Sequence, residues 1–118
     1  MRVKVRLGLA APRVWLFHSR RRYLRWCLER TGQAEDDSVD GMTTYSDGEA
    51  AVLYLRRKGA TLAEDASILA HEACHVAMEH MRWLGDDTWG DEALAYTVQA
   101  VTLGLMEAHM LWMTRKRV

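Results

Sequence analysis

Apolar and polar residues alternate at the start of the chain. Residues 2–8 place Val3, Val5 and Leu7 between arginine and lysine residues, a period of two that is typical of a half-buried strand. The apolar run 14–17 extends this first region. The pattern therefore predicts a strand over residues 2–8, with its extension a few residues later.

The spacing then changes to that of a helix. Ser19 is a favourable N-cap residue, apolar residues follow at helical intervals to about Arg30, and Gly32 supplies a stop signal. These signals predict a helix that begins after Ser19 and ends at about Arg30.

Residues 42–55 carry the signature of a β-hairpin. Asp47 and Gly48 separate two β-prone runs, 42–46 and 49–55, and an Asp-Gly pair supplies the positive φ angles of a tight two-residue turn. The second run is apolar at successive positions, so we expect both of its faces to be buried.

Two long helices are predicted to follow. The first opens at Thr61, which forms a capping box with Glu64, and it ends at about Leu84 before a glycine. The second has Asp91 as its expected N-cap and runs to about Thr114. The order of elements is strand, helix, hairpin, helix, helix.

Composition agrees with one packed domain. The 118 residues are 49% hydrophobic and 27% charged, so the chain can bury a core and is not expected to be disordered. One proline and eight glycines leave little material for a turn-rich all-β fold. We therefore expect a single α+β domain over residues 1–118.

Charge is divided unevenly although the net charge is zero. Residues 1–32 hold nine basic side chains and one acidic, whereas residues 33–118 hold seven basic and fifteen acidic. The arginines of residues 20–25 could meet nucleic acid or another anionic partner. They could equally cover the acidic remainder of their own fold.

Cysteine content and the N-terminal pattern favour the cytoplasm. Cys27 and Cys74 are the only cysteines and form no C-x-x-C pair, so neither a thiolate zinc site nor a disulfide framework is indicated. Pro12 and Arg13 interrupt the first apolar stretch before a secretory signal can form. We expect a cytoplasmic protein with reduced thiols.

The last predicted helix is unusually apolar. Glu107 and His109 lie inside it, and an ionised side chain in a bilayer is costly, so we expect no membrane span. Apolar residues occupy two sides of this helix, and two apolar faces need two partners. We expect the preceding helix to cover one side. The sheet could cover the other, or a second copy could bind it, giving a homodimer through residues 94–112.

One motif carries chemistry. His71, Glu72 and His75 form H-E-x-x-H inside a helix that has its own start and stop signals. Residues four apart lie on one face of a helix, so both imidazoles can bind one Zn²⁺ ion. Glu72 can then reach a water molecule at the metal without binding the metal itself.

A zinc site needs at least one further protein ligand. Glu92 follows His75 by seventeen positions and lies in the first turn of the next predicted helix. The loop 85–90 would let that helix pack against the metal helix with Glu92 facing the histidines. Asp91 is the competing ligand, although N-capping is its other expected role.

HEACH followed by GDEALAY resembles the paired helices of small gluzincin-type zinc metallopeptidases, similar to ImmA/IrrE-like and more loosely to SprT-like proteins. The likeness covers residues 42 to about 110. It implies a minimal zincin-like α+β fold in which a small antiparallel or mixed sheet packs on the H-E-x-x-H helix and two further helices. It also implies a zinc-dependent peptidase.

The resemblance further implies a mechanism. Zinc would activate a water, Glu72 would act as general base on a protein or peptide substrate, and Tyr96 would be a donor to the oxyanion. The run 49–55 would lie along the cleft and pair with extended substrate. The alternative is a non-catalytic zinc-stabilised binding or assembly module that uses its apolar C-terminal helix.

Overall fold

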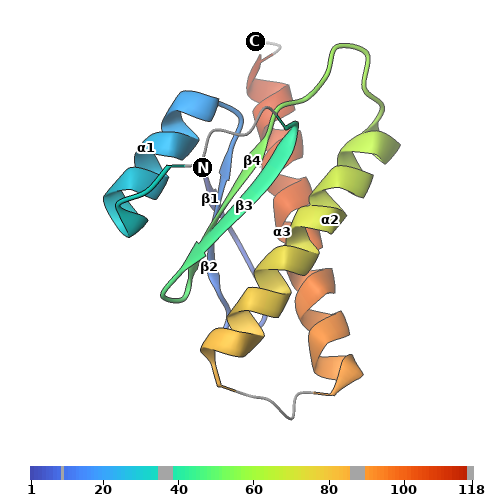
Figure 1. The fold of residues 1–118 in the computed structure, drawn as a ribbon. Coiled ribbons are helices and arrows are strands. Elements are labelled where there is room, and N and C mark those ends of the chain that lie inside the picture. The colour runs from blue at the N-terminus through green and yellow to red at the C-terminus, as the bar shows by residue number, and fades with distance from the viewer. Residues whose placement is uncertain (9, 35–38, 86–89, 117–118) are drawn as a thin grey trace.

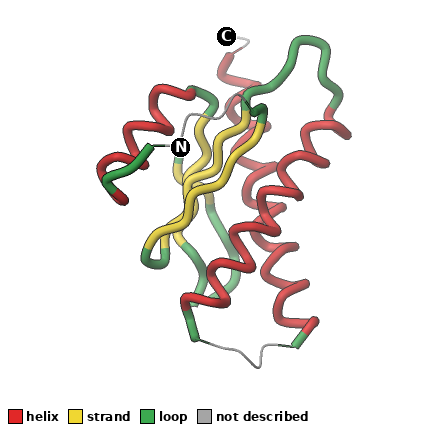
Figure 2. Tube along the Cα trace, in the orientation of Figure 1, coloured by secondary structure: helices red, strands yellow, loops and turns green. Residues whose placement is uncertain are grey.

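Strands and helices combine in an α+β arrangement (Figure 1, Figure 2). The computed structural model describes residues 1–8, 10–34, 39–85 and 90–116. Within them the strands are β1 (Arg2–Val3), β2 (Arg13–Phe17), β3 (Gly41–Ser46) and β4 (Glu49–Tyr54), and the helices are α1 (Arg20–Thr31), α2 (Leu62–Trp83) and α3 (Asp91–Lys116). The predicted α+β class is confirmed.

The four strands form one mixed sheet in the order β1-β2-β4-β3. β2 runs parallel to β4, and the other two pairs are antiparallel. α1 covers one face of the sheet, and α2 and α3 lie side by side on the other (Figure 1). β4 is therefore a central strand between two helical layers.

The apolar residues of β4 explain this sandwich. Val52 and Tyr54 join the core under α2 and α3, whereas Ala51 and Leu53 pack with Tyr23 of α1 on the opposite face. Successive strand residues point to opposite faces, so an unbroken apolar run needs cover on both sides. The expectation that both faces of this strand are buried is confirmed.

Local signals set the turn and the helix starts. Ser46 pairs with Glu49, and Asp47 and Gly48 take φ angles of 53° and 82°, as a two-residue hairpin turn requires. The Thr61 hydroxyl accepts a hydrogen bond from the backbone N–H of Glu64, and Ser19 caps α1 in the same way. The hairpin and both caps are confirmed.

The first strand is much shorter than its alternating sequence predicts. Only Arg2–Val3 pairs with β2, in the register Arg2 to Trp15 and Val3 to Val14. Continued pairing would bring Val5 opposite Pro12, which has no N–H to donate. The predicted strand over 2–8 was therefore wrong beyond Val3.

The last helix begins one residue earlier than expected. The Gly90 carbonyl accepts bonds from the N–H groups of Ala93 and Leu94, so Asp91 is the first helical residue and not the N-cap. Farther along, the backbone just after β1 approaches Gly104 so closely that a Cβ there would lie 2.5 Å from the Lys4 carbonyl oxygen. The glycine permits this strand-to-helix contact.

The two apolar sides of α3 have different environments. Val101 and Leu105 are fully buried in the core, whereas Tyr96, Leu103 and Met110 stay exposed. Among the helices of the described residues, none has a stretch long and apolar enough to cross a bilayer. One side of α3 thus belongs to the domain and the other remains available on its surface.

Candidate metal centre

The two histidines of the motif meet on the surface of α2. Their Nε2 atoms lie 3.3 Å apart, with the rings at 73° to each other. Two nitrogens bound at about 2.0–2.1 Å to one tetrahedral zinc ion are about 3.3–3.4 Å apart by simple geometry. The spacing of His71 and His75 therefore fits two adjacent corners of a zinc coordination sphere.

Glu72 lies beside this pair but is buried, with 5% of its surface exposed. The Thr43 hydroxyl of β3 donates a 2.8 Å hydrogen bond to Glu72 Oε1. Gly41 lies against the same carboxylate, because a Cβ at that position would be 3.0 Å from Oε2. The strand thus fixes one carboxylate oxygen by a hydrogen bond and leaves space for the other.

An open groove of about 370 Å³ runs between α2 and β3 along this site. Its lining includes the motif side chains together with Thr43, Tyr45 and Glu79. In the described sheet, β3 is an edge strand, whereas β4 is paired on both sides. The expectation that residues 49–55 lie along the cleft was therefore wrong, because the preceding strand occupies that position.

Tyr45 is tied to the groove wall by a histidine behind it. The phenol oxygen lies 2.6 Å from His80 Nδ1, and His80 Nε2 lies within hydrogen-bonding distance of the Ala10 carbonyl. Burial raises the pKa of Tyr45 to about 12, so its hydroxyl stays protonated at neutral pH. His80 is buried, and both of its ring nitrogens are used in these contacts.

Glu92 is not beside the histidine pair in this structure. His109 Nε2 donates a 2.9 Å bond to Asp65 Oδ2, which fixes the register between the antiparallel helices α2 and α3. Counted along ideal antiparallel helices from this contact, His75 would be level with Gln99, and Glu92 would lie seven residues, or about 10 Å, farther along the axis.

Asp91 and Tyr96 also belong to the outer surface of α3. Both are exposed, and neither lines the groove that holds the histidines. No group of three or more His, Cys, Asp or Glu side chains that could hold a metal is assembled by the residues that the structure describes. Residues 86–89 of the predicted connecting loop lie outside those residues. The third ligand stays a prediction.

The thiol of Cys74 lies outside the buried face of this helix. Ala73 and Ala77 are fully buried, whereas Cys74 is exposed. It follows Ala73 by a further 100° around the helix, which carries it past the buried face.

The supporting residues on β3 were missed. Gly41, Thr43 and Tyr45 are separated by two positions each, so they share one face of the strand. That periodicity was visible in the sequence. The residues that this face contacts were not, because nothing local shows that it meets Glu72 and His80.

Comparison of the chain with models of protein families, with curated proteins and with solved structures gives no match.

Proposed function

We propose that the chain is a zinc-dependent metallopeptidase with a minimal zincin-like fold. The supporting observation is the pair of exposed imidazole nitrogens at a separation suited to one zinc ion, with a buried glutamate next to them. His71 and His75 would hold the ion. Glu92 of α3, with Asp91 as the alternative, is the proposed third ligand, and its binding would require the first turn of α3 to move toward the histidines from the position seen here. Zinc, when bound, supplies the Lewis acidity that makes water nucleophilic near neutral pH.

Glu72 would be the general base. Its Oε1 accepts the hydrogen bond from Thr43, so Oε2 is the atom that would take a proton from water and return it to the leaving amine. Because Glu72 is buried, bulk water has little access to its carboxylate and does not compete as a hydrogen-bond donor to Oε2. Thr43 acts as a positioning residue, because its bond limits rotation of the carboxylate.

The substrate we propose is an extended peptide segment. Within the described sheet the outer edge of β3 pairs with no other strand, and the groove lies between this edge and α2. A peptide added to an exposed strand edge gains main-chain hydrogen bonds independently of its side chains. The reacting carbonyl would then lie close to the H-E-x-x-H side chains.

The proposal is tested by separating metal binding from turnover. We expect the purified protein to bind close to one zinc ion per chain by elemental analysis and to cleave an unstructured protein such as casein. Glu72→Gln should keep the zinc and the thermal unfolding profile but lose cleavage. His71→Ala should lose the zinc, and Glu79→Gln, a change in the same groove, should lose neither. Undiminished cleavage by the Glu72 variant would refute the enzymatic role.

A paired substitution addresses the third ligand. Glu92→Gln and Asp91→Asn change neighbouring carboxylates in the first turn of α3 by the same chemistry. If Glu92 binds the metal, only its variant should weaken zinc affinity, by about tenfold or more. If both variants bind zinc with the same affinity as the wild type, neither carboxylate of α3 is a zinc ligand.

One observation favours a second function. Tyr96, Leu103 and Met110 form an exposed apolar row with a spacing of seven residues on α3, as on helices that bind another helix. A zinc-stabilised assembly module that forms a homodimer through residues 94–112 is therefore the alternative. Leu103→Glu should reduce the apparent mass in light scattering under this alternative and leave it unchanged if the chain is monomeric.

A further inference from the structure

The arginines of the described residues differ in their partners. Those that form ion pairs with carboxylates are Arg6, Arg13, Arg30, Arg56, Arg57 and Arg82. Arg2 lies over the ring of Trp15, and Arg20 donates to the Val39 carbonyl. The remaining ones are exposed and form no ion pair within the described part of the chain, and they are Arg21, Arg22, Arg25 and Arg115. We name this last set the basic face.

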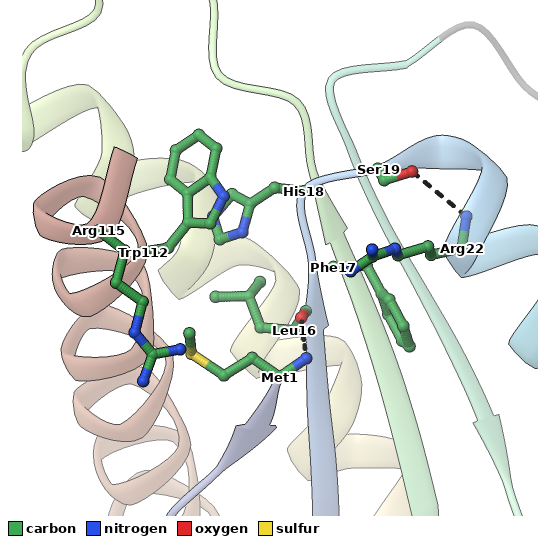
Figure 3. Close-up of a pocket in the computed structure, with 8 residues that line it drawn as sticks. All are labelled: Met1, Leu16, Phe17, His18, Ser19, Arg22, Trp112 and Arg115. Carbon is green, nitrogen blue, oxygen red and sulfur yellow. Dashed lines mark hydrogen bonds between the residues drawn. The ribbon is translucent and has the colours of Figure 1, made fainter. Parts of the chain in front are cut away.

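The basic face lies at one end of the molecule. All but one of its arginines belong to the first half of α1, and Arg115 is near the end of α3. Figure 3 shows Arg22 and Arg115 on opposite sides of β2, and both line one cavity. The basic face thus consists of separate positive charges spread over two helices. Such an arrangement matches an extended polyanion and not a single small anion.

The fold does not neutralise these charges. Glu29 is the only acidic residue among residues 1–32, and it follows Arg25 by four positions. No ion pair joins Glu29 to Arg25 in the described structure, and Glu49 is already shared by two other arginines. One alternative for the arginines of α1 was that they cover the acidic part of their own fold. Within the described residues, the basic face does not take that role.

The like charges are unfavourable for the helix that carries them. Arg21 and Arg25 are one turn apart, and like charges at this spacing destabilise a helix. The first turn of α1 has no acidic residue, although the N-terminus of a helix favours negative charge. Buried contacts hold α1 in place, including the 2.5 Å hydrogen bond between the hydroxyls of Tyr23 and Thr44. A bound polyanion would relieve a repulsion that the described fold leaves in place.

The other side chains of α1 distinguish between classes of polyanion. Tyr23, Trp26 and Cys27 are buried, and Leu28 is the one large apolar side chain of this helix that is exposed, so α1 has no apolar face to insert into a membrane surface. Proteins that hold single-stranded nucleic acid use exposed aromatic rings on which bases stack, and both aromatic residues of α1 are buried. Duplex DNA requires neither feature, because its phosphates lie on the outside.

We propose that the basic face binds the phosphate backbone of duplex DNA. Guanidinium groups donate paired hydrogen bonds to phosphate oxygens, and contacts to phosphates alone bind DNA without reading its sequence. α1 covers the face of the sheet opposite α2 and the metal groove (Figure 1). DNA and a peptide substrate would therefore bind on different sides of the protein. This interaction does not depend on the proposed peptidase activity.

Fluorescence anisotropy with a labelled duplex of about 16 base pairs tests the proposal on the full chain. We expect saturable binding at about 50 mM salt, with an affinity that falls by about 40- to 150-fold at 200 mM salt. This range follows from a slope of about −0.9 for each of three or four phosphate contacts. A chelator should leave the affinity unchanged, because the metal groove is on the other side. Absence of binding at the lower salt concentration, or an affinity independent of salt, would overturn the proposal.

A matched pair of double variants assigns the binding to the basic face. Arg21→Gln with Arg25→Gln should weaken binding by about tenfold or more and reduce the salt slope by about two units. Lys58→Gln with Arg82→Gln removes the same charge from exposed positions outside the basic face. This control should keep the slope and change the affinity by less than about threefold. Equal weakening by both double variants would contradict a defined binding face.

The contribution of α3 and the integrity of the fold are measured separately. Arg115→Gln should reduce the salt slope by about one unit, and an unchanged slope would contradict a face that spans both helices. Urea unfolding of the Arg21 and Arg25 double variant should show a midpoint no lower than that of the wild type, because removing like charges relieves repulsion in α1. A loss of DNA binding in that variant is then not a loss of fold.

The other polyanions are outcomes of the same measurement. A single strand of the same length and vesicles of anionic phospholipid are titrated beside the duplex. We expect both to bind more weakly than the duplex. Tighter binding of either one, lost in the Arg21 and Arg25 double variant, would overturn the proposal in favour of that partner. None of these results bears on zinc binding or peptide cleavage, so this proposal and the proposed function fail independently.

Discussion

Helix α2 carries two clusters built from the same side-chain types in opposite environments. Near its start, Asp65 is fully buried and contacts His109, Tyr54 and Arg56. Two turns later, His71 and His75 are exposed and, in the described residues, contact chiefly each other. Imidazole and carboxylate groups therefore stabilise the fold in one place and remain available to a ligand in the other.

The difference teaches how burial decides the role of a histidine. A buried polar group must be fully hydrogen-bonded, because an unpaired one loses its hydration without compensation. Both ring nitrogens of His109 are used in this way. An exposed pair has water as its alternative partner, so a metal ion can replace that water without disturbing the core.

The largest expected effect is on the buried cluster. Asp65→Ala removes the hydrogen-bond acceptor of three residues, Tyr54, Arg56 and His109. A charged arginine and a buried histidine lose their partner, which should lower the free energy of unfolding by about 3–5 kcal/mol. Urea unfolding measures this loss. Glu79→Ala is the matched control in the exposed region, since its ion pair with Arg82 is on the surface and is worth less than about 1 kcal/mol. Similar losses of free energy of unfolding in both variants would contradict the proposed difference between the buried and the exposed region.

The next effect concerns zinc. Zinc at a hundred times its dissociation constant should stabilise the wild type by about 2.7 kcal/mol, because it binds the folded state. His75→Gln should abolish this increment with little change in metal-free stability. His109→Gln should lower the stability of the metal-free protein but leave the stabilisation by zinc unchanged. Thermal unfolding with and without zinc, each against a chelator blank, distinguishes the two histidines.

A smaller effect is expected at the junction between strand and motif. Thr43→Val removes the hydroxyl that bonds Glu72 Oε1 and should cost about 1 kcal/mol of stability. Zinc affinity should not change, whereas the maximal rate of peptide cleavage should fall because the carboxylate is less constrained. Thr44→Val, a neighbouring change with no bond to Glu72, serves as the control for the rate. An unaltered rate in the Thr43 variant would remove its positioning role.

The smallest effect is on acid stability. Burial by itself raises the pKa of Asp65, but hydrogen bonds, led by those from Arg56 and Tyr54, outweigh it and hold the pKa below its usual value. Because the pKa of Asp65 is lower in the folded state than in the unfolded state, ionised Asp65 stabilises the fold at pH values above its unfolded-state pKa, which is near 4. This stabilisation is lost as the pH falls through the folded-state pKa. The stability gap between wild type and Asp65→Asn should therefore narrow below about pH 4, as urea unfolding at several pH values can show. A gap independent of pH would contradict an ionised Asp65.

Sequence patterns predicted the features that depend on a few neighbouring residues. The caps at Ser19 and Thr61 and the turn at Asp47 and Gly48 need only local hydrogen bonds and φ angles, so their signals are complete within a few positions. The spacing of His71 and His75 likewise follows from one turn of helix. These parts of the fold and site were therefore accessible without the tertiary structure.

Other features depend on partners far away in the chain. The length of β1 is limited by Pro12, which precedes the opposing strand β2. The position of Glu92 depends on the register between two helices, to which the contact of Asp65 with His109 contributes. No pattern around Glu92 contains that information. The same limit explains why the strand beside the groove was misassigned, since strand order in a sheet is a non-local property.

The contact at Gly104 has a consequence for the order of folding. The Lys4 backbone meets this glycine, and Arg6 pairs with Glu107 across 101 positions of sequence, so residues 4–6 cannot pack on α3 until α3 has been synthesised. Closing so long a loop carries an entropic cost before any contact compensates it. On the ribosome, β1 can pair with β2 early, but the contacts of residues 4–6 with α3 can form only after Gly104 and Glu107 have emerged.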